Sequence, residues 1–146
     1  RAMLETPSDK VCWIDADCEV LQPLDEIFNY PTSTKMALTK DLVRPMYWAT
    51  GVNVIKGKPD ILMRWVERCE NNPKGTRGDQ ECLGDLIGIT DDYIVEMPQE
   101  YQWLRLMLDR GYDSSDKKII HWTGPNGKQH IRQRLMNESK IYTNTK

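Results

Sequence analysis

Short apolar runs alternate with segments of helical periodicity along most of this 146-residue chain. The runs are rich in Val and Ile and are bounded by Gly, Pro, Asn or Asp, which is typical of strands. The helical segments place apolar residues three and four positions apart, as on one face of an amphipathic helix. We expect strands at residues 11–14, 35–39, 51–57, 92–98 and 117–122, and helices at residues 24–28, 58–69 and 79–87. This alternation predicts an α/β fold with a mostly parallel or mixed sheet.

The first of these strands runs directly into two aspartates, Asp15 and Asp17, with only Ala16 between them. Residues two apart on a strand point the same way, so the two carboxylates can converge on one point. Like charges held together are costly unless a positive charge lies between them, and hard divalent cations prefer carboxylate and phosphate oxygens. In open α/β sheets, ligands also bind beyond the carboxyl ends of strands. The pair therefore indicates a metal site, although a solvent-exposed acidic turn explains the same two residues.

Both histidines of the chain, His121 and His130, occur in the segment IIHWTGPNGKQH. His121 closes an apolar strand, and we interpret the following residues as a Gly/Pro loop with exposed backbone at Gly124 and Gly127, and then Lys128. An imidazole beside such a loop suits a cation together with a phosphate, because the ring nitrogen binds the cation while amides and ammonium bind the anion. The alternative is a buried histidine at a strand end, with its polar atoms satisfied.

A third polar pair, Asp79 and Gln80, follows a polar loop and opens a predicted helix. An aspartate at this position is also a favourable helix cap, and one residue can serve both roles.

Composition excludes several classes of function. The net charge is -2 and the chain has no basic block, so nucleic acid is not an expected partner. No apolar run approaches the ~20 residues that a membrane-spanning helix needs. The four cysteines form no C-x-x-C pair, which favours a reduced interior and a cytoplasmic location, with one disulfide left open.

Several of these segments together resemble a known family. The segment VCWIDADCEVLQPLDEIF resembles the D-x-D segment of GT-A-fold, nucleotide-sugar-dependent glycosyltransferases. The segments ATGVNVIKGKPDILMRWVERC, GDQECLGDLI, PQEYQW and HWTGPNGK are similar to further elements of the retaining glycogenin and lipopolysaccharide-galactosyltransferase type. They occur in the family's order between Val11 and Lys128, so the set is more specific than any one element.

The resemblance implies a role for each candidate residue. Asp15, Asp17 and His121 would be ligands of Mn²⁺ or Mg²⁺. Lys128, with the backbone at Gly124 and Gly127, would hold the diphosphate of a nucleotide-sugar donor. Asp79 and Gln80 would line the side of the site that binds the sugar and a carbohydrate or other hydroxyl acceptor. The implied fold is a partial GT-A-like mixed sheet flanked by helices.

The family's amino-terminal half, which binds the nucleotide base, has no counterpart in these residues. We therefore expect residues 1–146 to form a single domain that is the carboxy-terminal portion of a glycosyltransferase catalytic domain, with a tail from about residue 131. Whether two chains pair to replace that half is left open.

Two other interpretations remain at this point. Haloacid-dehalogenase-type phosphohydrolases also place an Asp-x-Asp after a strand, and Asp91–Asp92 offers the second acidic pair that they need. Alternatively, the chain is a non-catalytic fragment or binding module of transferase origin.

Overall fold

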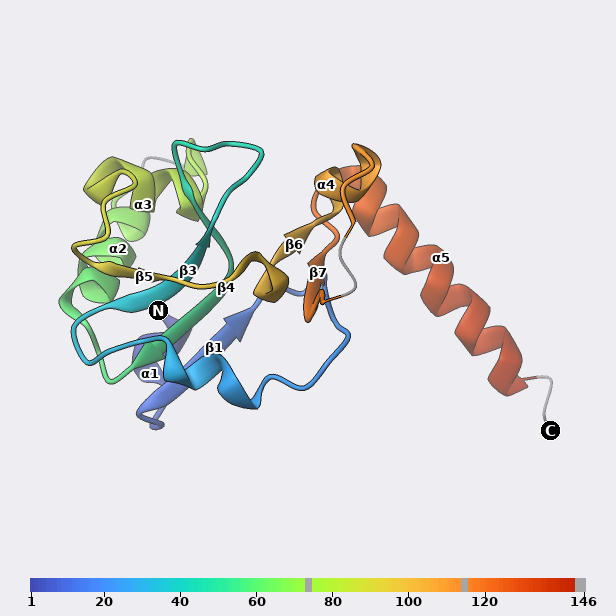
Figure 1. Cartoon of the computed structure of the whole chain (residues 1–146), viewed down its shortest axis with the longest axis horizontal. Helices are drawn as coiled ribbons and strands as arrows, with labels where there is room; N and C mark the ends of the chain where they lie inside the picture. Colours follow the sequence, from blue (N-terminus) through green and yellow to red (C-terminus); the bar gives the residue numbers. More distant parts are fainter. Residues whose placement is uncertain (73–74, 114–115, 144–146) are drawn as a thin grey trace.

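The computed structural model describes residues 1–72, 75–113 and 116–143, with side chains as far as residue 137. Its elements form two sheets, a helical layer and a long carboxy-terminal helix (Figure 1). The predicted α/β class with a mixed sheet is confirmed. Within the described residues, no helix combines the length and the apolar character needed to cross a bilayer.

The larger sheet has four strands in the order β1, β4, β3, β5. These strands span Lys10–Ile14, Trp48–Lys56, Met36–Lys40 and Ile94–Glu96. β4 runs antiparallel to both of its neighbours, β1 and β3, whereas β3 and β5 are parallel. It follows that β1, β3 and β5 all run in the same direction, so that their carboxyl ends lie at one end of the sheet.

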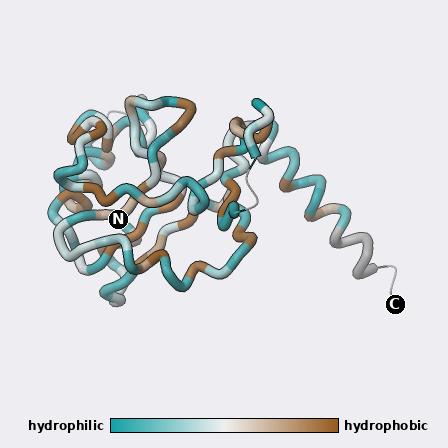
Figure 2. The backbone as a smooth tube through the Cα atoms, in the orientation of Figure 1, coloured by the Kyte–Doolittle hydropathy of each residue, from teal (hydrophilic) through white to brown (hydrophobic). Residues whose placement is uncertain are grey.

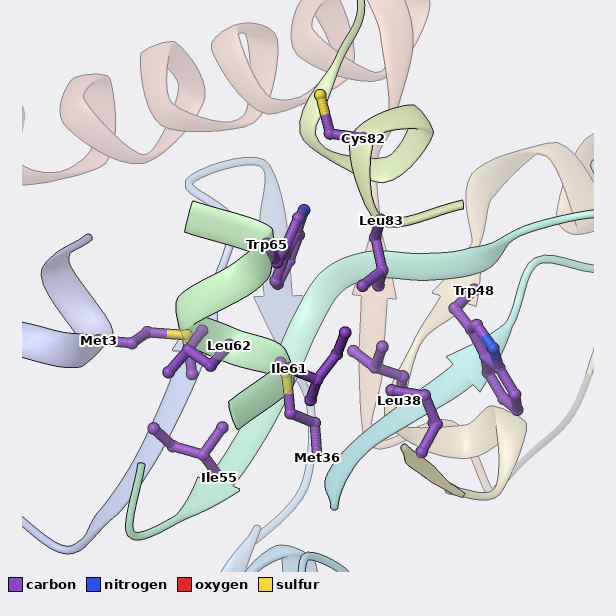
Figure 3. Packing of buried hydrophobic residues seen from close by; sticks show 11 residues of the cluster. Met3, Met36, Leu38, Trp48, Ile55, Ile61, Leu62, Trp65, Cys82 and Leu83 are labelled. Carbon is purple, nitrogen blue, oxygen red and sulfur yellow. The ribbon is translucent and has the colours of Figure 1, made fainter. Parts of the chain in front are cut away.

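Two helices, α2 (Asp60–Glu70) and α3 (Asp79–Ile87), pack together over the larger sheet (Figure 1). The short helix α1 (Ala2–Glu5) adds Met3 to the same core. Figure 3 shows how the apolar side chains of α2 and α3 meet those of β3 and β4. In α2 the buried residues are Ile61, Leu62 and Trp65, which is the helical spacing that the sequence predicts.

A second apolar cluster packs β1 and β4 against segments that include two 3₁₀ helices, η1 (Asp25–Asn29) and η3 (Gln99–Tyr101). Ile27 and Tyr101 are its most deeply buried members from these two helices. The expected helix at residues 24–28 is thus present as a tighter 3₁₀ segment.

The smaller sheet has three short strands in the order β2 (Cys18–Val20), β7 (Ile119–His121) and β6 (Trp103–Leu104). β2 runs antiparallel to β7, and β6 runs parallel to it. The sequence analysis does not predict β2 or β6. A short helix, α4 (Arg105–Asp109), follows β6.

The expectation of a loop after His121 is wrong. Helix α5 (Gly124–Thr143) begins there and extends away from both sheets (Figure 1). Pro125 falls in its first turn, where the missing N–H costs no hydrogen bond, and Gly124 has a φ of 77° at the point where the chain turns into the helix. Residue 131, where we expected a tail to begin, lies within this helix. Figure 2 shows that the described part of α5 is mostly hydrophilic.

Candidate active site

Asp15 and Asp17 lie in a tight turn that joins the two sheets, after β1 ends at Ile14. The Asp15 N–H donates to the Gly51 carbonyl at 2.9 Å, and the Cys18 N–H donates back to the Asp15 carbonyl at 2.9 Å. The two aspartates thus follow the expected strand, but strand geometry does not explain their convergence. They face the same region because the chain turns between them.

His121 lies beside both carboxylates. Its Nε2 atom is 3.1 Å from Asp17 Oδ1 and 3.9 Å from Asp15 Oδ2. The pairing of β2 with β7 brings these residues together, since Cys18 is the direct partner of His121 in the ladder. The Trp122 N–H also donates to the Asp17 carbonyl at 2.8 Å, which ties the end of β7 to the turn. The three residues expected to be metal ligands thus converge in space.

Two neutral residues, Gly51 and Gln102, lie on the Nδ1 side of the His121 ring, and the two aspartates lie on its Nε2 side. Gly51 supplies the space, because a Cβ at this position would lie 2.4 Å from Nδ1. Gln102, which is 1% exposed, accepts the Val52 N–H at 2.8 Å through its side-chain oxygen. Its amide nitrogen therefore points to His121 Nδ1, at 3.3 Å. Because an amide nitrogen only donates, Nδ1 accepts, and the neutral ring carries its proton on Nε2, toward Asp17.

Burial shapes the ionisation of the turn. The pKa of Asp15 is raised by burial and by the nearby charges of Asp79 and Asp17, against a hydrogen bond from Trp13 Nε1 at 2.7 Å and the proximity of His121. Burial, together with the charges of Asp15 and Asp17, raises the pKa of the Cys18 thiol to about 12. Burial is the largest cause of both shifts, so the charged forms of these groups are costly here unless a positive charge lies beside them.

Helix α3 brings the second acidic region to the same place. The Asp79 carboxylate accepts the Gln80 N–H at 2.9 Å, and the Asp79 carbonyl accepts Trp65 Nε1 at 2.7 Å, which anchors the start of α3 to α2. Both ends of the Gln80 amide are held: its nitrogen donates to Asp41 Oδ2 at 2.8 Å, and its oxygen accepts from Arg44 at 2.6 Å.

Asp41 is the centre of that support. It is 4% exposed and also accepts the backbone N–H groups of Val43 and Arg44 at 2.9 Å. A buried carboxylate with this many donors is well satisfied, so the Asp41–Arg44 pair fixes the orientation of Gln80.

A polar cavity of about 540 Å³ lies where these groups meet. Seven of the eight candidate residues line it: Asp15, Asp17, Asp79, Gln80, His121, Gly124 and Lys128. Arg132 lines it too, one helical turn beyond Lys128 on α5. The negative groups therefore come from the β1–β2 turn and α3, and the positive groups come from α5.

Gly127 has a different position from the one expected. It is buried in the first turns of α5, where a Cβ would lie 2.0 Å from the Trp122 carbonyl oxygen. It allows the helix to approach the backbone after β7 closely, and does not line the cavity.

The second acidic pair that a phosphohydrolase of the haloacid-dehalogenase type needs is far from the first. Asp91 and Asp92 are exposed and precede β5, whereas Asp15 and Asp17 follow β1. Since β1 and β5 run in the same direction at opposite edges of the sheet, the two pairs lie at opposite ends of it. The structure does not favour this interpretation.

Solved structures with similar folds agree with the arrangement of the two sheets and helices. The glycosyltransferase GlyE of Streptococcus pneumoniae TIGR4 matches 82% of this chain with a TM-score of 0.63 and 19% identity. The galactosyltransferase LgtC, solved in complex with donor and acceptor sugar analogs, matches 82% of it with a TM-score of 0.60 and 17% identity. The chain has a glycosyltransferase-like fold.

The chain spans 35% of the length of GlyE and 54% of that of LgtC. No protein-family model matches the sequence, and no curated protein does. At these identities the similarity concerns the fold, and the chemistry has to be argued from the cavity itself.

The sequence analysis missed several residues of this glycosyltransferase-like fold that line the cavity or position the residues lining it. Gln102 and Asp41 show no local motif, since their partners are far away in the chain. Arg132 had a usable signal, four positions after Lys128, but this spacing has a meaning only if the segment is helical. The supporting role of Gly51 depends on where the ring of His121 lies, which no sequence pattern shows.

Proposed function

We propose that this chain forms the cation- and diphosphate-binding part of a glycosyltransferase that moves a sugar from a nucleotide-diphosphate sugar to a hydroxyl group of a carbohydrate or other acceptor. The observation that carries the proposal is the composition of one cavity. It joins two aspartates, a histidine and the start of α3 on one side to the start of α5, Lys128 and Arg132 on the other.

The donor set on the acidic side fits a divalent cation such as Mn²⁺ or Mg²⁺. His121 offers its ring nitrogen Nε2. Asp15 and Asp17 each offer a carboxylate oxygen, and these oxygens lie 3.9 and 3.1 Å from that nitrogen. A cation held at Nε2 would take the place of the hydrogen bond to Asp17, and the ring proton would then lie on Nδ1. The Gln102 amide would have to turn its oxygen to that proton and release the Val52 N–H. When bound, such a cation neutralises the charge that develops on a diphosphate leaving group.

The basic side fits the diphosphate. Thr123 and Gly124 line the cavity at the start of α5, so the backbone N–H groups of the first helical turn and the positive end of the helix lie there. Lys128 and Arg132 add two positive charges. Together these groups stabilise negative charge as it accumulates on the departing diphosphate, which is an electrostatic form of catalysis.

Asp79 and Gln80 act on the reacting groups. The Gln80 amide is held by Asp41 and Arg44, so it offers a fixed dipole to the sugar. In a retaining reaction, these residues orient and polarise the sugar and acceptor. In an inverting reaction, the Asp79 carboxylate takes the proton of the acceptor hydroxyl.

Isothermal titration of the whole chain with uridine or guanosine diphosphate, with and without Mn²⁺, tests the proposal. We expect binding that requires Mn²⁺ and that Asp17→Asn abolishes, while the exposed Asp9→Asn retains it. Absence of Mn²⁺-dependent binding would leave the non-catalytic fragment as the better description. Mn²⁺-dependent hydrolysis of a generic phosphate ester would instead restore the phosphohydrolase interpretation.

A further inference from the structure

Cys18 is placed with the candidate metal ligands by the backbone itself. It is the direct partner of His121 in the antiparallel β2–β7 ladder. Side chains at directly opposed positions lie on the same face of a sheet, with Cβ atoms about 4.5–5.5 Å apart. Asp17 precedes Cys18, and the hydrogen bond from the Trp122 N–H to the Asp17 carbonyl keeps the register of this pair.

The thiol belongs to a compact group of three different donors. One potential ligand atom from each of Asp17, Cys18 and His121 lies within 4.8 Å of the other two. Bonds of about 2.0–2.3 Å to a metal require ligand atoms to approach within about 4 Å of one another, so small side-chain rotations complete the site. Among the described residues, the thiol makes one weak hydrogen bond, to the Gly51 carbonyl at 3.8 Å, and its other neighbours belong to the second apolar cluster.

We propose that Cys18 is a ligand of the cation that binds at Asp17 and His121, and that the site therefore prefers a thiophilic divalent cation such as Zn²⁺ over Mg²⁺. This inference rests on the proposed function for the existence of the cation site, and adds the identity of a ligand and the class of cation. A carboxylate, an imidazole and a thiolate form a mixed oxygen, nitrogen and sulfur set, which suits Zn²⁺ and Co²⁺. A set of carboxylates and water suits Mg²⁺.

Coordination replaces the proton on the Cys18 thiol, which leaves to solvent as the sulfur–metal bond forms. Asp15 remains beside the three ligands, with its carboxylate 3.9 Å from His121 Nε2. We expect its carboxylate to supply a fourth protein ligand when no diphosphate is bound.

Titration of the whole chain with Co²⁺ tests this directly, because a thiolate bound to Co²⁺ gives a charge-transfer band in the near ultraviolet that oxygen and nitrogen ligands do not give. We expect this band in the unchanged protein and in Cys12→Ser, whose thiol lies in β1. We expect Cys18→Ser to lose the band. We also expect it to lose at least about tenfold in Zn²⁺ affinity measured by competition with a chelator, since even outer-shell partners commonly change metal affinity by that factor. Its Mg²⁺ affinity should change little.

Two results would overturn the inference: bound Co²⁺ without a charge-transfer band, or a band that Cys18→Ser retains. Circular dichroism of Cys18→Ser checks that the variant folds, and Cys18→Asp, which keeps a ligand of similar reach, should restore binding of Co²⁺ without the band. If nucleoside diphosphate binding still requires Mn²⁺ while the band is absent, only the role of Cys18 fails. If no cation binds at all, the proposed function fails with it.

Discussion

Gly51 lies directly against the ring of His121. A Cβ on residue 51 would be 2.4 Å from Nδ1 and 2.5 Å from Cε1, distances that real Cβ atoms do not reach. The absence of a side chain in the middle of the buried strand β4 is thus what allows the imidazole to lie beside the two aspartates.

Gly51→Ala should push the ring of His121 away from Asp17. Overpacking of this kind costs about 1–3 kcal/mol, which urea unfolding measures. The displacement of the ring should show in the imidazole signals of the NMR spectrum, where the chain has only two histidines. Val52→Ala is the matched control, since it destabilises the same strand by removing buried methyl groups without touching the ring. Equal loss of Mn²⁺-dependent nucleotide binding in both variants would contradict a specific role of Gly51.

Gln102 should determine which nitrogen of His121 carries the proton. We expect the Nε2–H form in the cation-free protein, identified by the ¹⁵N shifts of the ring. In Gln102→Glu the carboxylate accepts both the Val52 N–H and the Nδ1–H, so the proton moves to Nδ1 and the Nε2 lone pair is left for a cation. Tighter Mn²⁺ binding should accompany the change.

Gln102→Leu is the control for that substitution, because it removes the partner of Nδ1 altogether. It leaves the Val52 N–H unpaired, which costs about 1–3 kcal/mol of stability, and it should not favour Nδ1–H. Identical ring ¹⁵N shifts in all three proteins would show that Gln102 has no influence on the tautomer.

Lys128→Ala and Arg132→Ala should each weaken binding of a nucleoside diphosphate. Both side chains are exposed, so the expected loss is about 2- to 5-fold, as for an ion pair worth up to about 1 kcal/mol. The salt dependence of binding should also become weaker. Lys56→Ala makes the same charge change at the other end of the sheet, beside Lys10, and should leave the affinity unchanged. An effect of Lys56→Ala as large as the others would mean that only net charge matters.

Asp15→Asn should stabilise the cation-free protein at neutral pH. The folded state raises the pKa of Asp15, so it holds the proton more tightly than the unfolded chain, and stability falls as pH rises through and above the ordinary value of 3.8. The amide keeps an acceptor for Trp13 Nε1 and removes this pH-dependent loss. Melting temperatures measured with chelator across the acid range check this, and the exposed Asp9→Asn should keep the dependence of the unchanged protein.

Gly127→Ala should alter the cavity through the backbone. The added Cβ meets the Trp122 carbonyl at 2.0 Å, so the start of α5 must shift, and Lys128 and Arg132 move with it. Gly57→Ala is the comparison: it strains a φ of 72° in open space and costs about 1–2 kcal/mol, and it follows β4 at the end of the sheet opposite the Asp15–Asp17 turn. Both variants lose stability, but only Gly127→Ala should lower nucleotide affinity.

The elements with a clear period were predictable from the sequence. The helix at Asp60–Glu70 and the strands at the larger sheet follow from spacing and composition, because each buries one face against the same core. The start of α5 was not predictable in this way. Gly124, Pro125 and Gly127 favour a loop by local propensity, yet a proline in the first turn and a glycine against Trp122 are both compatible with a helix that packs closely.

The residues of the candidate site that carry chemistry were predictable from the sequence, but the residues that position them were not. Asp15, Asp17 and His121 stand out as chemistry-bearing residues at the ends of apolar runs. Gln102 and Asp41 do not, since an amide or a carboxylate acquires its role only from partners that the fold brings to it. Asp17 and Cys18 show the same limit, because the β2–β7 register that pairs Cys18 with His121 is a long-range property.

Asp17 and His121 are 104 positions apart in the chain, and the β2–β7 ladder that brings them together has three residue pairs. Closing so large a loop costs entropy before any contact repays it, and contacts of this range form late. The β1–β4–β3 sheet, whose partners lie closer together in the chain, can assemble first. A nascent chain that has emerged only as far as α4 therefore carries both aspartates but lacks the site, which is completed only when β7 pairs with β2.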